Sequence, residues 1–242
     1  MKTKAGGESE MYMAPHTDEG RRRFLKQSSL LAVALPAWLG AGKFCGTQTV
    51  TPARAETVGG ACEGCEAVHL GRPREVASRT RIAPEGEPGE PLEMAGRILR
   101  ADAKTPAPGV ILYVYHTDAR GLYSPAPGAE GWLRRHGRLR GWVKSDARGE
   151  YAFRTIRPAS YPDSANPQHI HPVIKEPGVN EYWIDEFVFD DDPLLTEQHR
   201  ARQNRGGSGI VKLTRSGGVW RGTRDIVLGL NVPGYPPPQP SA

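Results

Sequence analysis

Residues 146–175 read DARGEYAFRTIRPASYPDSANPQHIHPVIK and contain two candidate β-strands joined by a proline-rich loop. These strands, at residues 149–156 and 169–175, are rich in β-branched and aromatic residues, and the turn sequence DARG precedes the first. Similar runs lie at residues 96–102, 109–118, 141–146, 181–190, 209–215 and 219–230. Roughly eight short strands separated by turns predict an all-β fold, an antiparallel two-sheet β-sandwich.

The composition favours the same fold. The chain has 242 residues, of which 38% are hydrophobic, with 29 glycines and 22 prolines. So much Gly and Pro favours short strands and tight turns, and one helix is expected at residues 196–203. Residues 56–91 lack a sustained period and are predicted to form an irregular N-terminal arm or linker. The sandwich domain is predicted over residues 92–242, ending in an extended proline-rich tail.

The net charge of +5 does not indicate a nucleic-acid partner. Eight of the 32 Lys and Arg residues, but only four of the 27 Asp and Glu residues, lie within residues 1–55. The rest of the chain is therefore close to neutral, which excludes an electrostatic case for binding a polyanion. The sequence does not indicate an oligomeric state.

Residues 1–55 have the parts of an export signal. RRRFLK at residues 21–26 resembles the twin-arginine motif, and a moderately apolar run follows at residues 30–41. That run is too short to span a bilayer stably, and ARA at residues 53–55 offers a cleavage site. We predict a cleaved twin-arginine-type signal peptide and a periplasmic or secreted protein without a membrane association. A structured N-terminal helix is the alternative.

After such cleavage, Cys62 and Cys65 would be the remaining cysteines. In an oxidising compartment their spacing favours a local disulfide on the arm. Half of a metal site and a redox pair are the alternatives.

Two histidines one residue apart suggest a metal site. His169 and His171 are expected on one face of a strand, about 7 Å apart along the chain. Two such imidazoles can converge on one ion, although chance surface histidines are the alternative. A phenol has a pKa near 10 and becomes a ligand when a hard cation deprotonates it. Phenolates stabilise ferric iron, so the predicted Fe(3+) ligands are Tyr123, Tyr161, His169 and His171.

The order of the motifs DARGLY, DARGEYAFRTIRPASYP, HIH and FDDDPL resembles the intradiol ring-cleavage dioxygenases, the protocatechuate and catechol 1,2-dioxygenase family. The resemblance covers residues 92–230 and is most specific at residues 146–171. It implies a β-sandwich that holds a mononuclear non-haem Fe(III) through two tyrosines and two histidines. It further implies O₂ and a catecholic substrate, with the ring opened between its hydroxyl-bearing carbons to a muconate-type diacid. By analogy, Tyr161 would be the ligand that the substrate displaces.

Two positions depart from the family pattern. Asn166 stands where the family has an arginine that steadies negative charge on the substrate ring, and Glu186 stands where it has a glutamine. A neutral amide cannot replace a guanidinium electrostatically, and a carboxylate opposes an anionic substrate. Arg157 and Arg154 are candidates to take the place of the missing cation. The predicted catalytic residues are Tyr161, Asn166 and Glu186.

Three functions follow from this sequence. The first is an Fe(III) dioxygenase that opens catecholic rings. The second is a non-catalytic iron- or ligand-binding β-sandwich that has lost ring cleavage. The third is another oxidative or hydrolytic reaction at the same iron, in which Glu186 acts as a base. The fold alone does not choose among them.

Overall fold

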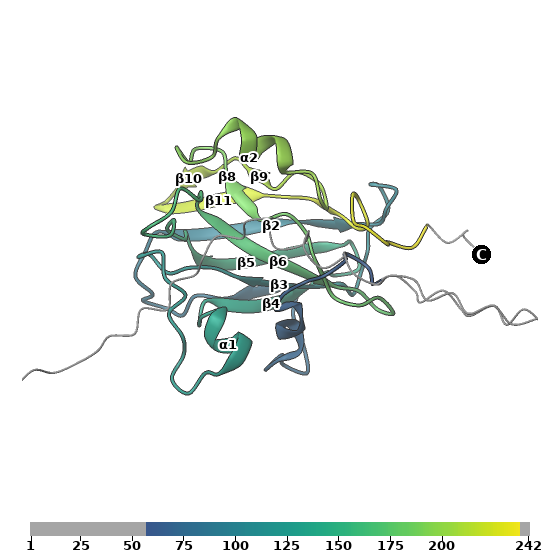
Figure 1. The fold of residues 1–242 in the computed structure, drawn as a ribbon, viewed down its shortest axis with the longest axis horizontal. Helices are drawn as coiled ribbons and strands as arrows, with labels where there is room; N and C mark the ends of the chain where they lie inside the picture. Colours follow the sequence, from purple (N-terminus) through teal and green to yellow (C-terminus); the bar gives the residue numbers. More distant parts are fainter. Residues whose placement is uncertain (1–56, 238–242) are drawn as a thin grey trace, which may run out of the picture. The chain divides into compact units, whose positions relative to one another are not determined.

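The computed structural model describes residues 57–237, and these residues form two β-sheets (Figure 1). The first sheet has the strand order β1-β5-β2-β11-β10, with β12 also paired to β2. The second has the order β4-β3-β6-β8-β9, with β7 also paired to β6. The strands of the first sheet are β1 (Arg79–Arg81), β2 (Pro91–Leu99), β5 (Glu150–Ile156), β10 (Thr214–Ser216), β11 (Val219–Thr223) and β12 (Ile226–Val227). Those of the second are β3 (Ile111–Tyr115), β4 (Arg140–Lys144), β6 (His169–Lys175), β7 (Tyr182–Trp183), β8 (Phe187–Phe189) and β9 (Ile210–Val211).

The main hydrophobic core lies between the two sheets. Leu92 and Met94 of β2 pack there with Leu112 of β3 because alternate side chains of a strand point to the same side. Phe153 of β5 meets Phe187 of β8 edge to face, with ring centroids 6.0 Å apart. Such aromatic pairs contribute about 0.5–1.5 kcal/mol beyond the area they bury. This pair therefore links the two sheets directly.

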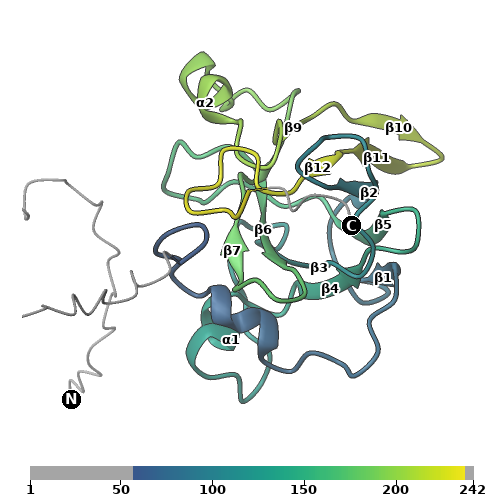
Figure 2. The same ribbon diagram turned by 90° about the vertical axis from the view of Figure 1, so that its right-hand side faces the viewer.

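The N-terminal segment covers the outer face of the second sheet. Its 3-10 helix η1 (Cys65–His69) packs Ala67 and Val68 against Tyr113 of β3. Cys62 and Cys65 form a disulfide at the start of η1. Figures 1 and 2 show η1 beside the short helix α1 (Gly131–Arg135) on this side of the sheet. Strand β3 is consequently covered on both faces.

The all-β two-sheet fold agrees with the sequence prediction. Strand β6 coincides with the run at residues 169–175, and helix α2 (Glu197–Arg202) begins after the N-cap Thr196, whose hydroxyl accepts a hydrogen bond from the His199 amide. The run at residues 181–190 is divided into β7 and β8. Helix α1 was not predicted. Central pairs such as β2–β5 and β3–β6 are antiparallel, whereas β1–β5, β2–β11, β2–β12 and β8–β9 are parallel.

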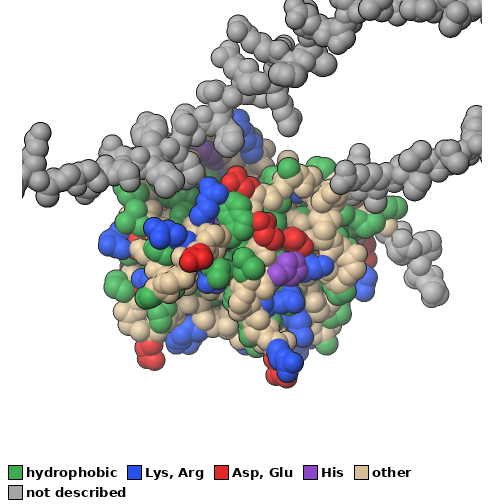
Figure 3. Space-filling view, turned by 60° about the horizontal axis from the view of Figure 1, so that its bottom comes forward, with side chains coloured by type: hydrophobic (Ala, Val, Ile, Leu, Met, Phe, Trp, Pro, Cys, Tyr) green, Lys and Arg blue, Asp and Glu red, His purple; other side chains and the backbone are tan. Residues whose placement is uncertain are grey.

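The predicted signal peptide at residues 1–55 lies outside the described residues. The structure describes the expected C-terminal tail as far as residue 237. None of the helices found between residues 57 and 237 has the length and apolar character needed to cross a bilayer. On the face drawn in Figure 3, basic and acidic side chains are interspersed.

Candidate metal centre

Four side chains from three parts of the chain bring their polar atoms together on the outer face of the second sheet. Tyr123 Oη lies 2.9 Å from Tyr161 Oη, and Tyr161 Oη lies 3.0 Å from His169 Nε2. His169 Nε2 in turn lies 3.1 Å from His171 Nε2. Neighbouring ligands of one ion have this separation, since metal–nitrogen bonds of about 2 Å place them about 3 Å apart. The arrangement has the dimensions of a metal centre.

The protons in this cluster also indicate a site for a cation. His169 Nδ1 lies 2.6 Å from the Pro167 carbonyl oxygen, which can only accept, so the ring proton is on Nδ1 and Nε2 carries its lone pair. Two groups, the Tyr161 hydroxyl and His171 Nε2, then converge on that single lone pair. Protons alone cannot satisfy both contacts well. A cation shared by the donors would satisfy all of them, so the residues fit a metal ion.

Burial keeps the two ligand types neutral when no cation is near. It raises the pKa of Tyr123 and of Tyr161, and the Glu186 carboxylate raises both further. Burial also holds the pKa of His171 well below its ordinary value, assisted by the imidazole of His169. A neutral imidazole is the form that binds metal, whereas a phenol must lose its proton to a hard cation. Phenolate donors of this kind suit ferric iron.

Strand β6 positions both imidazoles. Because successive strand residues alternate, His169 and His171 share the outer face while Ile170 enters the core. Across the sheet, His171 pairs with Tyr115 of β3, and their rings stack with centroids 4.6 Å apart. The other face of Tyr115 lies 3.7 Å from the ring of His136. Tyr115 thus fixes the plane of the His171 ring.

A turn after β3 positions Tyr123. The buried Asp118 carboxylate accepts hydrogen bonds from the Arg120 amide at 2.9 Å, the Leu122 amide at 3.2 Å and the Ser124 hydroxyl at 2.7 Å. Burial opposes its charge, but these hydrogen bonds and the Arg120 guanidinium outweigh burial and lower the pKa of Asp118 to about 2. The Asp118 carbonyl oxygen also accepts a bond from the Ala159 amide at 3.3 Å, which ties this turn to the segment that carries Tyr161.

Gly121 lets the two tyrosine segments approach each other. It has a φ of +79°, and a Cβ atom at this position would lie 2.0 Å from the Ser160 carbonyl oxygen. We expect Gly121→Ala to push the turn away from Ser160, separate Tyr123 from Tyr161, and weaken iron binding by tenfold or more, the order found when groups that orient metal ligands are altered. Iron content per chain and the melting temperature measure the effect.

Gly109→Ala is the matched control. Gly109 has a φ of +78°, but no atom lies within 4 Å of the added Cβ position. Its alanine variant should lose about 1–2 kcal/mol of stability through backbone strain and leave the affinity of the candidate centre for a metal ion unchanged. Equal iron retention in the two variants would contradict the role given to Gly121.

A cavity of about 210 Å³ opens beside the cluster. It is lined by Tyr161, Asn166, Pro167, His169, His171, Glu186, Val188, His199 and Gln203. Asn166 is exposed at its rim, and the Glu186 carboxylate lies 3.6 Å from His171 Nδ1, beyond a direct hydrogen bond. Tyr123 does not line the cavity. The cavity wall therefore includes the three predicted catalytic residues, Tyr161, Asn166 and Glu186, and does not include Tyr123.

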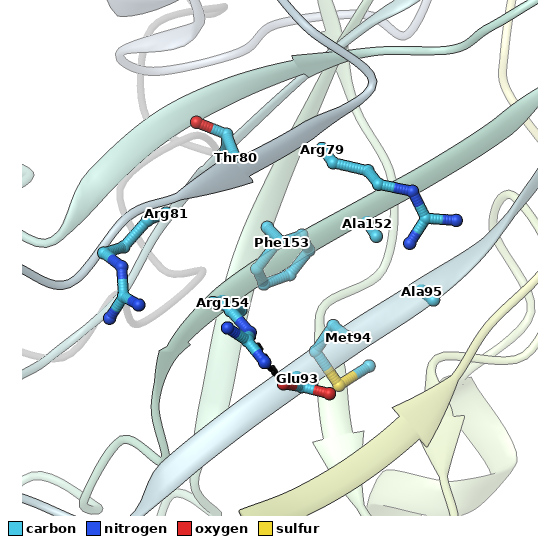
Figure 4. Close-up of a pocket in the computed structure, with 9 residues that line it drawn as sticks. All are labelled: Arg79, Thr80, Arg81, Glu93, Met94, Ala95, Ala152, Phe153 and Arg154. Carbon is cyan, nitrogen blue, oxygen red and sulfur yellow. Dashed lines mark hydrogen bonds and ion pairs between the residues drawn. The ribbon is translucent and has the colours of Figure 1, made fainter.

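Neither arginine considered as a substitute for the missing cation reaches this cavity. Arg157 donates to both carboxylate oxygens of Asp191, at 2.9 and 2.8 Å, and to Gln168 at 2.6 Å. Arg154 lies on the outer face of the first sheet, where its Nε donates to Glu93 at 2.6 Å (Figure 4). Of these two candidates, neither lines the cavity where the family arginine would be expected.

Four further residues lie beside the site and were not predicted from the sequence: Tyr115, His136, His199 and Gln203. Tyr115 ends a strand in which Tyr113 lies on the same face, so that face could be predicted from the sequence. Its pairing with His171 depends on the register of β3 against β6. His199 lies in α2 and Gln203 is its C-cap residue; the sequence predicted this helix but not what it packs against. No signal in the sequence marks these two.

The fold and the cluster define the class of protein: a two-sheet β protein with two phenols and two imidazoles at a candidate metal centre. Among residues 57–237, no group of three or more His, Cys, Asp or Glu side chains is placed to hold a metal ion, so any metal at this centre depends on the tyrosines.

A family model described as Dioxygenase (Dioxygenase_C) matches residues 69–205, more than half of the chain. The chain belongs to this family, the intradiol dioxygenases. Catechol 1,2-dioxygenase 1 of Acinetobacter lwoffii is 29% identical over 136 residues, which are 49% of this chain and 42% of that protein. Catechol 1,2-dioxygenase 2 of the same organism is 27% identical over 125 residues, covering 45% of this chain and 43% of that protein. The matched region thus spans less than half of either relative.

Solved structures show the same fold. The mercury-inhibited catechol 1,2-dioxygenase of Acinetobacter sp. ADP1 superimposes with a TM-score of 0.52 at 23% identity, covering 68% of this chain and 60% of that one. A mutant catechol 1,2 dioxygenase of Acinetobacter radioresistens gives a TM-score of 0.52 at 18% identity, covering 72% and 63%.

Proposed function

We propose that this protein is a non-haem Fe(III) intradiol dioxygenase, which uses O₂ to cleave a catecholic ring between its two hydroxyl-bearing carbons and yields a muconate-type diacid. The observation that carries the proposal is the unbroken series of polar contacts from Tyr123 through Tyr161 and His169 to His171. Membership of the dioxygenase family and the likeness to catechol 1,2-dioxygenases support it.

The four side chains of this series would hold the iron. Ferric iron, when bound, supplies the Lewis-acid and redox chemistry through which an aromatic diol reacts with O₂. The protein contributes two anionic and two neutral donors, and β6 holds the neutral pair rigidly. The stacked ring of Tyr115 and the Pro167 carbonyl keep the two imidazoles oriented.

The two tyrosines have different roles in this proposal. Tyr161 lines the cavity and Tyr123 does not, so Tyr161 is the one that meets a substrate. As a phenolate, Tyr161 would take a proton from a catechol hydroxyl, which a base within hydrogen-bond reach can do. Tyr123 would remain as the permanent anionic donor behind it.

A second function is favoured by one observation: no Lys or Arg side chain lines the cavity. Without a fixed cation, negative charge that builds on a substrate ring receives no stabilisation of the kind that a guanidinium gives. The second function is therefore an iron- and ligand-binding β-sandwich that does not cleave the ring.

Oxygen uptake by the iron-loaded protein with a panel of catechols, measured beside Asn166→Arg, tests these proposals. Asn166 is exposed at the cavity rim, so an arginine can be accommodated there. If the protein is a dioxygenase, the unaltered protein should consume O₂, and its tyrosinate-to-iron absorption should shift when catechol binds. Uptake by the variant alone would favour the second function, and no uptake or absorption shift in either protein would contradict the first.

We also propose that residues 1–55 are a cleaved twin-arginine signal and that the protein works in the periplasm or outside the cell. The Cys62–Cys65 disulfide supports this, because disulfides persist in oxidising compartments. Mass spectrometry of the protein from a periplasmic fraction would test it: a mature chain beginning near Glu56 is expected, and an intact N-terminus there would contradict the proposal.

A further inference from the structure

The cavity beside the candidate metal centre is small and rich in hydrogen-bond acceptors. Its volume of about 210 Å³ is below the ~300–1,000 Å³ typical of pockets for drug-sized ligands, so it suits a compound with a single ring. Glu186 and Gln203 both line it. Gln203 Oε1 is buried against Gly209, whereas the Glu186 side chain is partly exposed, so Glu186 is the acceptor that a ligand can reach.

Glu186 gives the cavity a negative field. Its side chain is 36% exposed, and its carboxylate lies 3.6 Å from His171 Nδ1. Glu186 also lines the cavity beside Tyr161, so its carboxylate lies next to the place where a substrate would bind.

No Lys or Arg side chain lines the cavity to offset this field. Arg157 is paired with Asp191, and Arg200 of α2 is paired with Asp190. Arg224 is buried outside the cavity wall and donates to the Asp185 and Gly207 carbonyl oxygens. His199 shares a hydrogen bond of 3.1 Å with the Thr196 hydroxyl. The two phenolates and the Glu186 carboxylate already balance a trivalent cation, so a catecholate that displaces one phenolate leaves the site with excess negative charge.

We propose that Glu186 is a specificity-determining residue, and that this site accepts catechols whose ring substituent is an ammonium group or a neutral hydrogen-bond donor while it rejects those that carry a carboxylate. The proposal rests on the proposed function, since it takes the cavity to be where the catechol binds. A substituent carboxylate would face Glu186 as a like charge, whereas an ammonium or hydroxyl group would donate to Glu186.

Anaerobic titration of the iron-loaded protein, followed by the shift of its tyrosinate-to-iron absorption, measures binding without turnover. Three probes share the catechol ring and differ in the substituent para to one hydroxyl. They are 3,4-dihydroxybenzoate, which is anionic, 4-methylcatechol, which is neutral, and 3,4-dihydroxyphenethylamine, which is cationic. We expect the amine to bind best and the carboxylate worst, with Kd values about tenfold or more apart, as for charges a few ångströms apart at a partly exposed site.

Glu186→Gln keeps the shape of the side chain and should tighten binding of the carboxylate probe about tenfold while weakening the amine probe. Glu197→Gln is the matched control, because Glu197 lies on α2 with a side chain that is 95% exposed and does not line the cavity. It should leave all three Kd values unchanged. Iron content is measured for each variant, so that lost metal is not mistaken for lost affinity.

Ionic strength provides a second measurement that needs no variant. Salt should narrow the difference between the amine and carboxylate probes in the unaltered protein, because the Glu186 side chain is partly exposed. Binding that is independent of probe charge, or a charge order that survives Glu186→Gln, would overturn the inference while the proposed function stands. The absence of any absorption shift with all three probes would overturn the proposed function, and the inference with it.

Discussion

Tyr123→Phe is expected to lower the affinity for iron by more than 100-fold and to abolish much of the visible absorption of the loaded protein. The variant keeps the ring and loses only the hydroxyl that lies 2.9 Å from Tyr161 Oη. Altering groups that merely orient metal ligands already costs about 10–100-fold in affinity, so loss of an anionic ligand should cost more. Metal analysis after dialysis and absorption spectroscopy measure the two effects.

Tyr151→Phe is the matched control for this result. Tyr151 is also buried, but its hydroxyl donates to the Arg224 carbonyl oxygen at 2.7 Å, and it belongs to the core between the sheets. Removing that hydroxyl should cost about 1–3 kcal/mol of stability, because a buried acceptor loses its partner, and should leave the iron in place. Unchanged iron content and absorption in Tyr123→Phe would show that the cluster is not the metal centre.

Stability is expected to fall as the pH drops from about 6.5 to about 4. Burial lowers the pKa of His116 to about 4 and does the same for His136. An unfolded histidine titrates near 6.5, so between these values the unfolded chain binds more protons than the folded one. The stabilisation from each neutral imidazole is therefore complete above pH 6.5 and is lost as the pH falls toward 4.

For His116, which is 1% exposed, this loss amounts to about 3 kcal/mol at pH 4. Its Nδ1 donates to the Thr117 carbonyl oxygen at 2.8 Å, and the Thr155 hydroxyl donates to Nε2 at 2.6 Å. Chemical denaturation at pH 7 and pH 4.5 measures the effect. His116→Asn leaves the proposed iron ligands intact and should be less stable at pH 7 but less sensitive to acid. A variant with the same pH slope as the parent protein would refute the assignment to His116.

The strands that carry strong local signals could be predicted from the sequence. The alternation in residues 169–175 put His169 and His171 on one face, and β6 has these bounds. The N-terminal segment was harder to interpret because its buried residues follow no period. Val68 is buried from η1 and Ile82 from the turn after β1, so neither a helical nor a strand pattern revealed them.

The tyrosine half of the site depends on contacts that a linear pattern does not contain. Tyr123 and Tyr161 approach each other because Gly121 touches the Ser160 carbonyl and because Asp118 holds the turn from within. The ligand chemistry of ferric iron and the resemblance to a family selected these two tyrosines from the sequence, but neither showed which contacts bring them together. The surroundings of Glu186 could not be predicted either, because they include His199 of α2 and its C-cap residue Gln203, which follow Glu186 by more than ten residues.

The placement of the histidines on a central strand and of the tyrosines on loops implies a staged response to denaturants. Residues of β6 are held by β3 on one side and by β7 and β8 on the other, whereas Tyr123 and Tyr161 lie outside the strands. Loops open at lower free energy than core strands. In rising urea the holoprotein should bleach before its far-ultraviolet circular dichroism changes, leaving a colourless, still folded sandwich that retains its imidazole pair.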